Sequence, residues 1–453
     1  MAGRSLKRRT WPRGGLWYHG DFLKLWGGQT ISEFGTQVSL LALPLIAIVQ
    51  LHASVFVVAA LGMVEQLPFL LFALPAGVWV DRLARRPILI AGDAGRALTL
   101  ASIPLAAVFY HVTITQLFVV GFVTGVLTVF FDVAYQSYLP SLVERDQLVE
   151  GNSKLQVSAS AAQIGGPGAA GALIAALTAP YAIVADAASY GASVLFMLGI
   201  RKREHVAARR APSDGASMKT ELFEGIRYVT GNRYLRAIAA CTANSNFFGN
   251  VCYSILLVYV VRRLDLTAQL IGIVLSCANV GLLIGALTAG WIADRLGVGR
   301  TILLSAAMVG PGLVLIPLSP IAFPVPLLVL SLIVFGFSGM LYNITQISLR
   351  QAITPERLQG RMNSVMRFIV WGVLPLGALL GGLLAATIGL RPTLFVAAVG
   401  GALSWIPIAI SPVRHLERVP EPDLAPLAPM GGIVAGVGTE GMTAGPGPAP
   451  VDA

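Results

Sequence analysis

The sequence predicts an all-α membrane protein in which twelve transmembrane helices form two homologous six-helix bundles. Three observations indicate this fold class. Apolar residues make up 55% of the 453 positions and charged residues only 12%, whereas an ordinary soluble domain has roughly 25% charged residues. Apolar segments of about 20 residues, the length that crosses the hydrocarbon core of a bilayer, recur along almost the whole chain. Motifs of the first half also return in the second half.

Six expected helices precede a polar break and six follow it. The first six cover residues 22–48, 54–79, 88–109, 115–139, 153–177 and 180–200. The second six cover residues 235–261, 268–292, 301–318, 324–349, 362–386 and 391–411. Glycine and proline inside these spans are compatible with helix, because membrane helices tolerate both.

These spans divide the chain into five regions. A basic N-terminus (1–21) precedes the N-terminal bundle (22–200), and a charged cytoplasmic linker (201–234) leads to the C-terminal bundle (235–411). The tail (412–453) is rich in Pro, Gly and Ala, and most of it has too few bulky apolar residues to offset the entropy of ordering. We therefore expect the tail to be cytoplasmic and disordered.

The distribution of basic residues predicts the orientation. If the N-terminus is cytoplasmic, the inner segments hold most of the Lys and Arg residues, and the outer loops hold only Arg262, Arg263 and Arg391. Cytoplasmic loops carry such an excess in membrane proteins. Both termini are thus expected in the cytoplasm. The net charge of +10 reflects this bias and attraction to anionic lipid better than it reflects nucleic-acid binding.

The sequence gives little support to an enzyme, a metal-binding protein or a disulfide-linked protein. Cys241, Cys252 and Cys277 fall within expected helices and have neither a disulfide pattern nor metal-ligand spacing. The five histidines lie at segment ends or in loops. Zinc-protease, nucleophile-elbow and phosphate-loop motifs do not occur. We therefore expect neither an enzyme nor an ATP-driven pump, and no cofactor or metal.

An internal repeat organises the two halves. Asp81, in a loop after the second expected helix, has its counterpart in Asp294, 213 positions later. Pro167 in the fifth helix is matched by Pro375, 208 positions later. Parallel repeats of this kind form an interface near the bilayer midplane, where transporters place their substrates.

The motifs resemble those of the major facilitator superfamily over roughly residues 20–412. The superfamily loop motif is matched by Gly77, Asp81, Arg82, Arg85 and Arg86, although Trp79 and Ala84 replace its usual Leu and Gly. The second half keeps Gly290, Asp294, Arg295, Gly297 and Arg300. The resemblance implies the major facilitator fold and a conformational latch between Asp81 and the eleventh helix. A solvated basic cluster held inside by charge alone is the alternative.

A second resemblance concerns the direction of transport. Gly166, Pro167 and Gly171 resemble a motif of proton-coupled drug antiporters, with Ala170 in place of one Gly. The segments 131–140 and 185–190 look like those of the enterobactin-exporter and macrolide-efflux branch. This likeness implies export across a bacterial plasma (inner) membrane. Pro167 would kink a helix in any case, so a purely structural role for the motif stays open.

Two polar stripes predict a central cavity. Gln29, Glu33 and Gln37 are spaced four apart in the first helix, and Thr242, Asn246 and Asn250 are their counterparts in the seventh. Residues at this spacing share one helical face, and lipid is an unfavourable place for polar groups. Tyr253 and Trp371 are candidate aromatic walls. Hydrogen bonding between helices, away from any substrate, is the alternative.

Carboxyl groups inside the expected helices are candidate proton carriers. Glu33 and Asp132 lie where an ionised carboxylate is costly, so each could exchange a proton during transport. The repeat replaces them by Asn246 and Asn343, which leaves the second half to bind substrate through Asn246, Asn250, Asn343 and Gln346. Alternatively, Asp132 braces a helix end, and Glu33 is permanently hydrogen-bonded to Gln29 or Gln37.

The remaining intramembrane charges are less clear from sequence. Asp93 and Arg96 stand three apart in the third helix and are expected to form a local ion pair. Glu65, Asp186 and Arg367 could face either the cavity or a neighbouring helix.

These observations predict a secondary active transporter that works by alternating access. The expected activity is proton-coupled efflux of a small amphipathic molecule, such as a drug, a macrolide, a siderophore or a metabolite. The expected partners are that substrate, protons and the lipid bilayer, without nucleic acid. A proton-coupled importer on the same fold is the nearer alternative and a non-transporting membrane receptor the more distant one. The oligomeric state is not readable from the residues.

Overall fold

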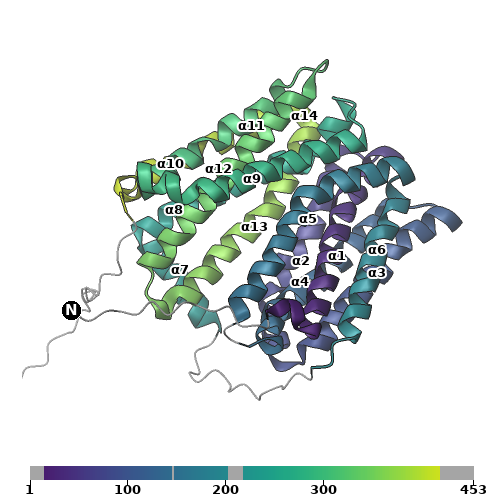
Figure 1. Cartoon of the computed structure of the whole chain (residues 1–453). Coiled ribbons are helices and arrows are strands. Elements are labelled where there is room, and N and C mark those ends of the chain that lie inside the picture. The colour runs from purple at the N-terminus through teal and green to yellow at the C-terminus, as the bar shows by residue number, and fades with distance from the viewer. Residues whose placement is uncertain (1–14, 145–146, 203–217, 419–453) are drawn as a thin grey trace, which may run out of the picture.

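Two helical bundles lie side by side in the computed structural model, which describes residues 15–144, 147–202 and 218–418. In Figure 1 the colour of the N-terminal bundle runs from purple to teal and that of the C-terminal bundle from teal through green to yellow. The described residues include twelve helical spans that are long and apolar enough to cross a membrane. The fold class predicted from the sequence is therefore confirmed.

Six spans form the N-terminal half. They are α1 (Gly20–Leu45), α2 (Val55–Arg82), α3 (Arg85–Phe109), α4 (Ile114–Leu142), α5 (Leu148–Leu177) and α6 (Ala179–Leu198), with a short 3-10 turn η1 (Leu16–Tyr18) before them. A single π-helical turn, η2 (Ile46–Gln50), extends α1. Ser54 and Thr113 cap α2 and α4, because their hydroxyls accept hydrogen bonds from the amides of Val57 and Gln116.

The C-terminal half contains the other six spans, two of them interrupted. Its helices are α8 (Arg233–Arg262), α9 (Ala268–Leu296), α10 (Val298–Ala307), α11 (Val309–Leu318), α12 (Pro324–Ile353), α13 (Glu356–Ile388), α14 (Leu390–Ala402), η4 (Leu403–Trp405), α15 (Ile406–Ala409) and η5 (Pro412–His415). The pair α10 and α11 makes one span, and the segment from α14 to α15 makes another.

Two segments for which the sequence predicted no secondary structure are folded. The expected linker (201–234) contains the helix α7 (Met218–Gly231). This helix packs closely on α13, because a Cβ atom added to Gly225 would lie 3.0 Å from the carbonyl oxygen of Arg361. The start of the expected tail (412–453) docks on α10, because the Gly299 amide donates a 2.8 Å hydrogen bond to the Leu416 carbonyl. Residues 1–14, 145–146, 203–217 and 419–453 lie outside the described part, and so does the rest of the expected disordered tail.

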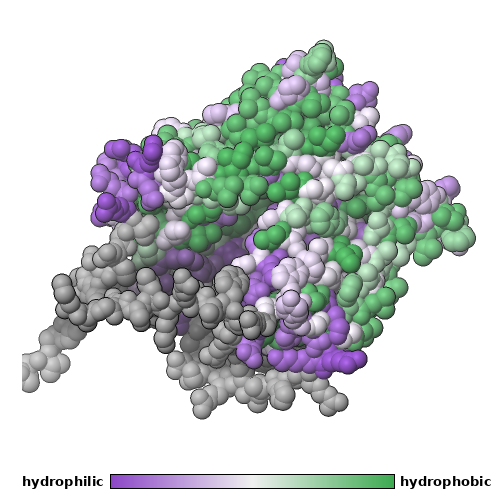
Figure 2. All heavy atoms as spheres, in the orientation of Figure 1, coloured by the Kyte–Doolittle hydropathy of each residue, from purple (hydrophilic) through white to green (hydrophobic). Residues whose placement is uncertain are grey.

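The surface is consistent with a membrane environment. Figure 2 shows hydrophobic side chains over the flanks of the helices and hydrophilic side chains gathered towards one end. Individual apolar side chains on these flanks are largely exposed, including Leu98 and Leu287 at 76% each. Apolar exposure on this scale would be unfavourable in water and is expected where lipid covers the protein.

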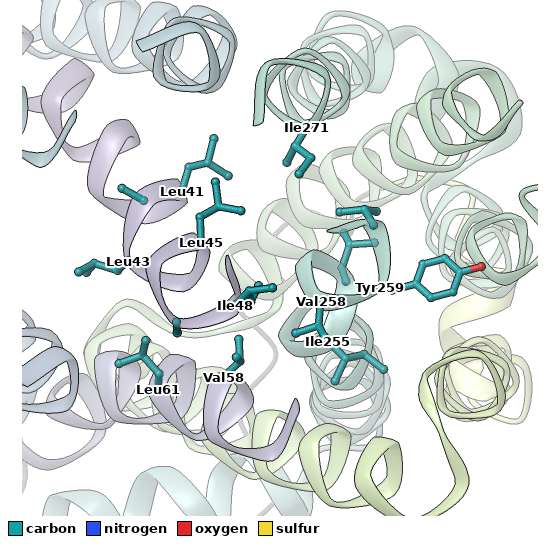
Figure 3. Close-up of a cluster of buried hydrophobic side chains, with 14 of the residues drawn as sticks. Leu41, Leu43, Leu45, Ile48, Val58, Leu61, Ile255, Val258, Tyr259 and Ile271 are labelled. Atoms are coloured by element: carbon teal, nitrogen blue, oxygen red, sulfur yellow. The ribbon is translucent and has the colours of Figure 1, made fainter. Parts of the chain in front are cut away.

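Within the described ranges, the buried apolar clusters join the two halves at one end and not at the other. Figure 3 shows Leu41, Leu45 and Ile48 of the first half in the same cluster as Ile255 and Ile271 of the second. We call this end, near residues 51–54 and 263–267, the closed end. At the opposite end, where the linker lies, each half has a separate apolar cluster. We call it the linker end.

Glycines allow the backbones of α5 and α9 to touch across the interface. A Cβ atom on Gly171 would overlap the carbonyl oxygen of Ala268, and one on Gly272 would overlap that of Pro167. The Gly168 amide also donates a 3.0 Å hydrogen bond to the Ser276 hydroxyl. Such close contact supplies van der Waals packing, the main attraction between helices in lipid.

A valine at Gly171 should therefore weaken the contact between α5 and α9. Overpacking of a tight contact costs about 1–3 kcal/mol, so Gly171→Val should lower the thermal midpoint of the purified protein in detergent. Gly191→Val in α6 is the matched control, because nothing lies within 4 Å of its Cβ position. Equal midpoints for the two variants would contradict the packing described here.

Candidate functional site

A cavity of about 330 Å³, with many polar and charged residues in its lining, lies inside the N-terminal half. Its walls come from α1, α2, α3, α4 and α6, and we call it the inner cavity. The polar and charged lining consists of Gln29, Ser32, Glu33, Thr36, Ser39, Glu65, Arg96, Thr124, Thr128, Asp132, Asp186 and Tyr190. The predicted residues Gln29, Glu33 and Asp132 thus line one space, although they come from two different helices.

Helical periodicity explains how α1 and α4 each contribute polar residues to the cavity wall. Gln29 and Glu33 stand four apart on α1, and the Gln29 amide donates a 2.9 Å hydrogen bond to the Glu33 carboxylate. On α4, Thr124, Thr128 and Asp132 are also spaced by four and share a face. The two threonines were not singled out from the sequence, although their spacing from Asp132 was a usable signal.

Arg96 is the cation of the inner cavity, and the expected ion pair with Asp93 is confirmed. Both side chains are buried, at 5% and 0% exposure. The guanidinium carbon lies 4.2 Å from the Phe131 ring centre and 4.3 Å from that of Tyr190. Such cation–π contacts add to the ion pair in a desolvated site. Sequence reasoning treated the pair as local support, but the structure also places Arg96 on the cavity wall.

Carboxyl groups outnumber this cation. Glu33, Glu65, Asp132 and Asp186 line the inner cavity together with one guanidinium. Asp132 is attracted by Arg96 and repelled by Glu33. Asp186 accepts a 3.2 Å hydrogen bond from the Ser189 hydroxyl. Because an unpaired buried charge is costly, the cavity favours the binding of protons or of a cationic group.

A second, mostly apolar cavity of about 160 Å³ lies between the two halves. We call it the outer pocket, because several of its residues belong to the apolar cluster of the closed end. Its walls come from α1, α2, α8, α9, α12 and α13. The polar lining is limited to Glu65, Gln66, Asn250, Tyr253 and Ser254. Asn250 and Tyr253 are the two predicted cavity residues that it contains.

The other predicted residues of the C-terminal half lie elsewhere. Asn246 donates a 3.0 Å hydrogen bond to the Thr242 carbonyl within α8, and Gln346 donates one of 3.2 Å to Asn343 within α12. None of these side chains lines the inner cavity or the outer pocket. Asn250 lines the outer pocket, but its amide donates to the Leu374 carbonyl of α13. In this conformation these amide side chains therefore form hydrogen bonds within and between helices, as the alternative to a cavity lining predicted.

Aromatic stacking joins the halves beside the inner cavity. Trp371 of α13 stacks on Phe69 of α2, with ring centres 4.6 Å apart and planes 9° from parallel. Phe69 lines the inner cavity, whereas Trp371 is not part of the lining. Trp371 is consequently a support for the cavity wall in this conformation.

The antiporter-like motif lies where α5 contacts two helices. A Cβ on Gly166 would overlap the side chain of Gln37, so Gln37 packs on α5 and does not line either cavity. Pro167 and Gly171 contact α9 of the other half through their backbones. The motif therefore forms close packing contacts within the N-terminal half and across the interface.

The expected latch residues lie at the linker end. The side chains of Asp81 and Arg82 are outside the described part, whereas Gly77, Arg85 and Arg86 are within it. Arg86 donates hydrogen bonds of 3.1 and 2.9 Å to the carbonyls of Met197 and Leu198, and Arg85 also has an interaction partner. In the second half, Asp294 is exposed, and Arg295 is exposed and lies 4.5 Å from the Trp291 ring centre.

Comparison with known proteins identifies the family. The model of the Major Facilitator Superfamily matches residues 25–373 and again residues 239–435. The chain belongs to this superfamily. It is therefore a transporter and not an enzyme, and its two six-helix halves are those of the major facilitator fold.

The curated relatives with related sequences include efflux proteins. The chain is 26% identical over 400 residues to the multidrug efflux pump Tap of Mycolicibacterium fortuitum, covering 86% of this chain and 95% of that one. It is 24% identical over 373 residues to macrolide efflux protein A of Streptococcus pyogenes, covering 82% and 90%. The predicted resemblance to this branch is thus confirmed.

Solved structures show the same fold at lower sequence identity. A bacterial homologue of the iron transporter ferroportin superposes with a TM-score of 0.65 at 17% identity, covering 86% of this chain and 98% of that one. The nucleoside transporter NupG gives 0.67 at 15% identity with the same coverage. These similarities concern the fold alone.

Thiol labelling should reveal the inner cavity. In a variant without Cys241, Cys252 and Cys277, a cysteine introduced at Thr128 should react with the hydrophilic cationic reagent MTSET, because this position lines the cavity. Ser331→Cys is the control that should stay unlabelled, since Ser331 is 0% exposed. Mass spectrometry of the intact protein reads the result. An unreactive cysteine at position 128, with the variant correctly folded, would count against a water-accessible cavity.

Proposed function

We propose that this transporter exports a small amphipathic molecule from the bacterial cytoplasm in exchange for protons. The observation that carries the proposal is the inner cavity, where four carboxyl groups and one guanidinium share a single lining. Ionisable residues inside membrane spans are rare and costly, and proton relays in transporters use them. The efflux relatives favour the outward direction for the substrate.

In this proposal Glu33 and Asp132 carry the coupled protons. The two carboxylates repel each other across the cavity, so protonation of one relieves the repulsion felt by the other. A positively charged or strongly polar substrate group would relieve it in the same way. Protons and substrate therefore compete for the same negative site, which couples their movements. A drug, a macrolide, a siderophore or a metabolite with such a group fits these requirements.

Alternating access would move the halves as rigid bodies around the cavity. The linker end carries Arg85 and Arg86, and the positive-inside rule assigns such a basic end, with both termini, to the cytoplasm. The present conformation, packed at the closed end, then loads substrate from the cytoplasm. We propose that contacts of Asp81 with α13 seal the linker end in the opposite conformation. The α5 segment Gly166–Pro167, which packs on α9, would help to seal the path between the halves.

The amide groups of the C-terminal half would act later in the cycle. Asn246, Asn250, Asn343 and Gln346 have hydrogen-bond partners within the protein in this conformation. We propose that the movement of the halves exchanges some of these partners for substrate. Tyr253 and Trp371 would then contribute aromatic surface to the substrate.

Transport by everted vesicles tests the coupling. With ethidium as the probe, an inside-acid proton gradient should drive accumulation by the parent protein, and Glu33→Gln and Asp132→Asn should abolish it at equal protein level. Glu224→Gln is the control, because Glu224 of α7 pairs with Arg361 outside both cavities. Full accumulation by both cavity variants, singly and together, would exclude these residues as proton carriers. Gradient-driven transport out of the vesicles would indicate an importer.

A further inference from the structure

Glu65 of α2 occupies the boundary between the two cavities. It lines the inner cavity within the N-terminal half and also the outer pocket between the halves. Among the described residues it is the titratable side chain common to both linings. Leu40, the other shared residue, cannot bind a proton.

The neighbouring helix leaves space for this carboxyl group. A Cβ on Gly121 of α4 would lie 3.0 Å from the Glu65 Cγ and 3.6 Å from its Oε1. A Cβ on Gly125 would lie 2.8 Å from the Glu65 backbone carbonyl oxygen. Both glycines therefore allow α2 and α4 to approach closely without displacing the side chain, as small residues do at contacts between membrane helices.

The Glu65 carboxyl group also lacks the partners that other cavity acids have. Asp132 faces Arg96 and Asp186 accepts a hydrogen bond from Ser189. No hydrogen bond or ion pair joins the Glu65 carboxyl to the rest of the described chain. Since the outer pocket is mostly apolar, an ionised carboxylate there would be poorly compensated. Glu65 must therefore hold a proton or meet a cation in this conformation.

The position of α2 makes the exposure of Glu65 sensitive to conformation. Tyr253 of α8 lines the same pocket from the other half. On the same helix α2, Phe69 stacks on Trp371 of α13. A movement of α8 and α13 away from α2 at the closed end would open the outer pocket to water, with Glu65 at its base.

We propose that Glu65 is a proton-exchange site that connects the outer pocket with the inner cavity. When the closed end opens, the carboxylate takes a proton from external water. As that end closes, the proton passes through cavity water to the carboxylates of Glu33 and Asp132, and a further proton or a cation from the cavity takes its place at Glu65. This inference rests on the proposed exchange of substrate for protons and adds the residue through which the protons enter.

Proteoliposomes with the purified full chain separate this role from substrate binding. Ethidium is the probe in two assays, one of accumulation driven by a proton gradient and one of counterflow exchange without a gradient. Glu65→Gln should lose the accumulation and keep the counterflow, because the amide fills the same space but binds no proton. Glu65→Asp should recover part of the accumulation. Glu224→Gln should match the parent in both assays.

The results of these assays distinguish the role of Glu65 from the proposed coupling to protons. Parent-like accumulation by Glu65→Gln overturns the role of Glu65 and leaves the proposed coupling intact. Loss of counterflow in both Glu65→Gln and Glu65→Asp indicates a substrate-binding or packing role and also overturns it. Accumulation by the parent that does not depend on the proton gradient overturns the proposed coupling itself.

Carbodiimide labelling gives a readout that needs no substrate. Dicyclohexylcarbodiimide reacts with protonated carboxyl groups in apolar surroundings, so it should modify Glu65 in the purified protein, as peptide mass spectrometry would show. Glu65→Gln should lose that modified peptide. Labelling of other cavity acids with Glu65 untouched, under conditions where the parent transports ethidium, would contradict the proposal.

Discussion

The N-terminal half depends on the compensation of one buried cation. Arg96 pairs with Asp93 on its own helix and lies against the rings of Phe131 and Tyr190 from α4 and α6. A charge at this depth is costly unless partners surround it, so the helices that supply the partners must stay together. The same guanidinium leaves most cavity carboxyls without a full counter-charge. The packing of these helices and the shortage of positive charge around the cavity carboxyls thus have a common physical origin.

Contacts between the halves are of two kinds, and the difference suits a moving interface. At the closed end, aliphatic side chains of both halves share one cluster, and Arg262 donates a 2.6 Å hydrogen bond to the Ala53 carbonyl. Along α5 and α9, backbones touch at glycines. Glycine contacts need little side-chain rearrangement when helices pivot, whereas the apolar cluster must separate for the closed end to open. The N-terminal half can therefore keep its charges together throughout.

The sequence predicted the fold well and the cavity in part. Hydropathy and the repeat around Asp81 and Asp294 are sufficient to predict the twelve membrane spans. Each helix that crosses the lipid must be about 20 residues long and mostly apolar. Spacing placed Gln29 and Glu33 on one face, but it could not show that Gln37, one turn on, packs against Gly166. Asn246 and Gln346 find partners within their own helices, which periodicity does not reveal. The helix α7 was not predicted because it lies in a charged segment. The position of Glu65 between two cavities depends on the tertiary packing of helices, which the sequence does not show.

In the proposed mechanism, substrate and protons compete for the carboxyl groups of the inner cavity. The most direct measurement is proton release on substrate binding by the purified protein in weakly buffered detergent solution, followed with a pH-sensitive dye. Addition of ethidium should acidify the solution, and the double variant Glu33→Gln, Asp132→Asn should release far fewer protons while it still folds. Binding of ethidium by the parent without proton release, or equal release by the double variant, would contradict the account.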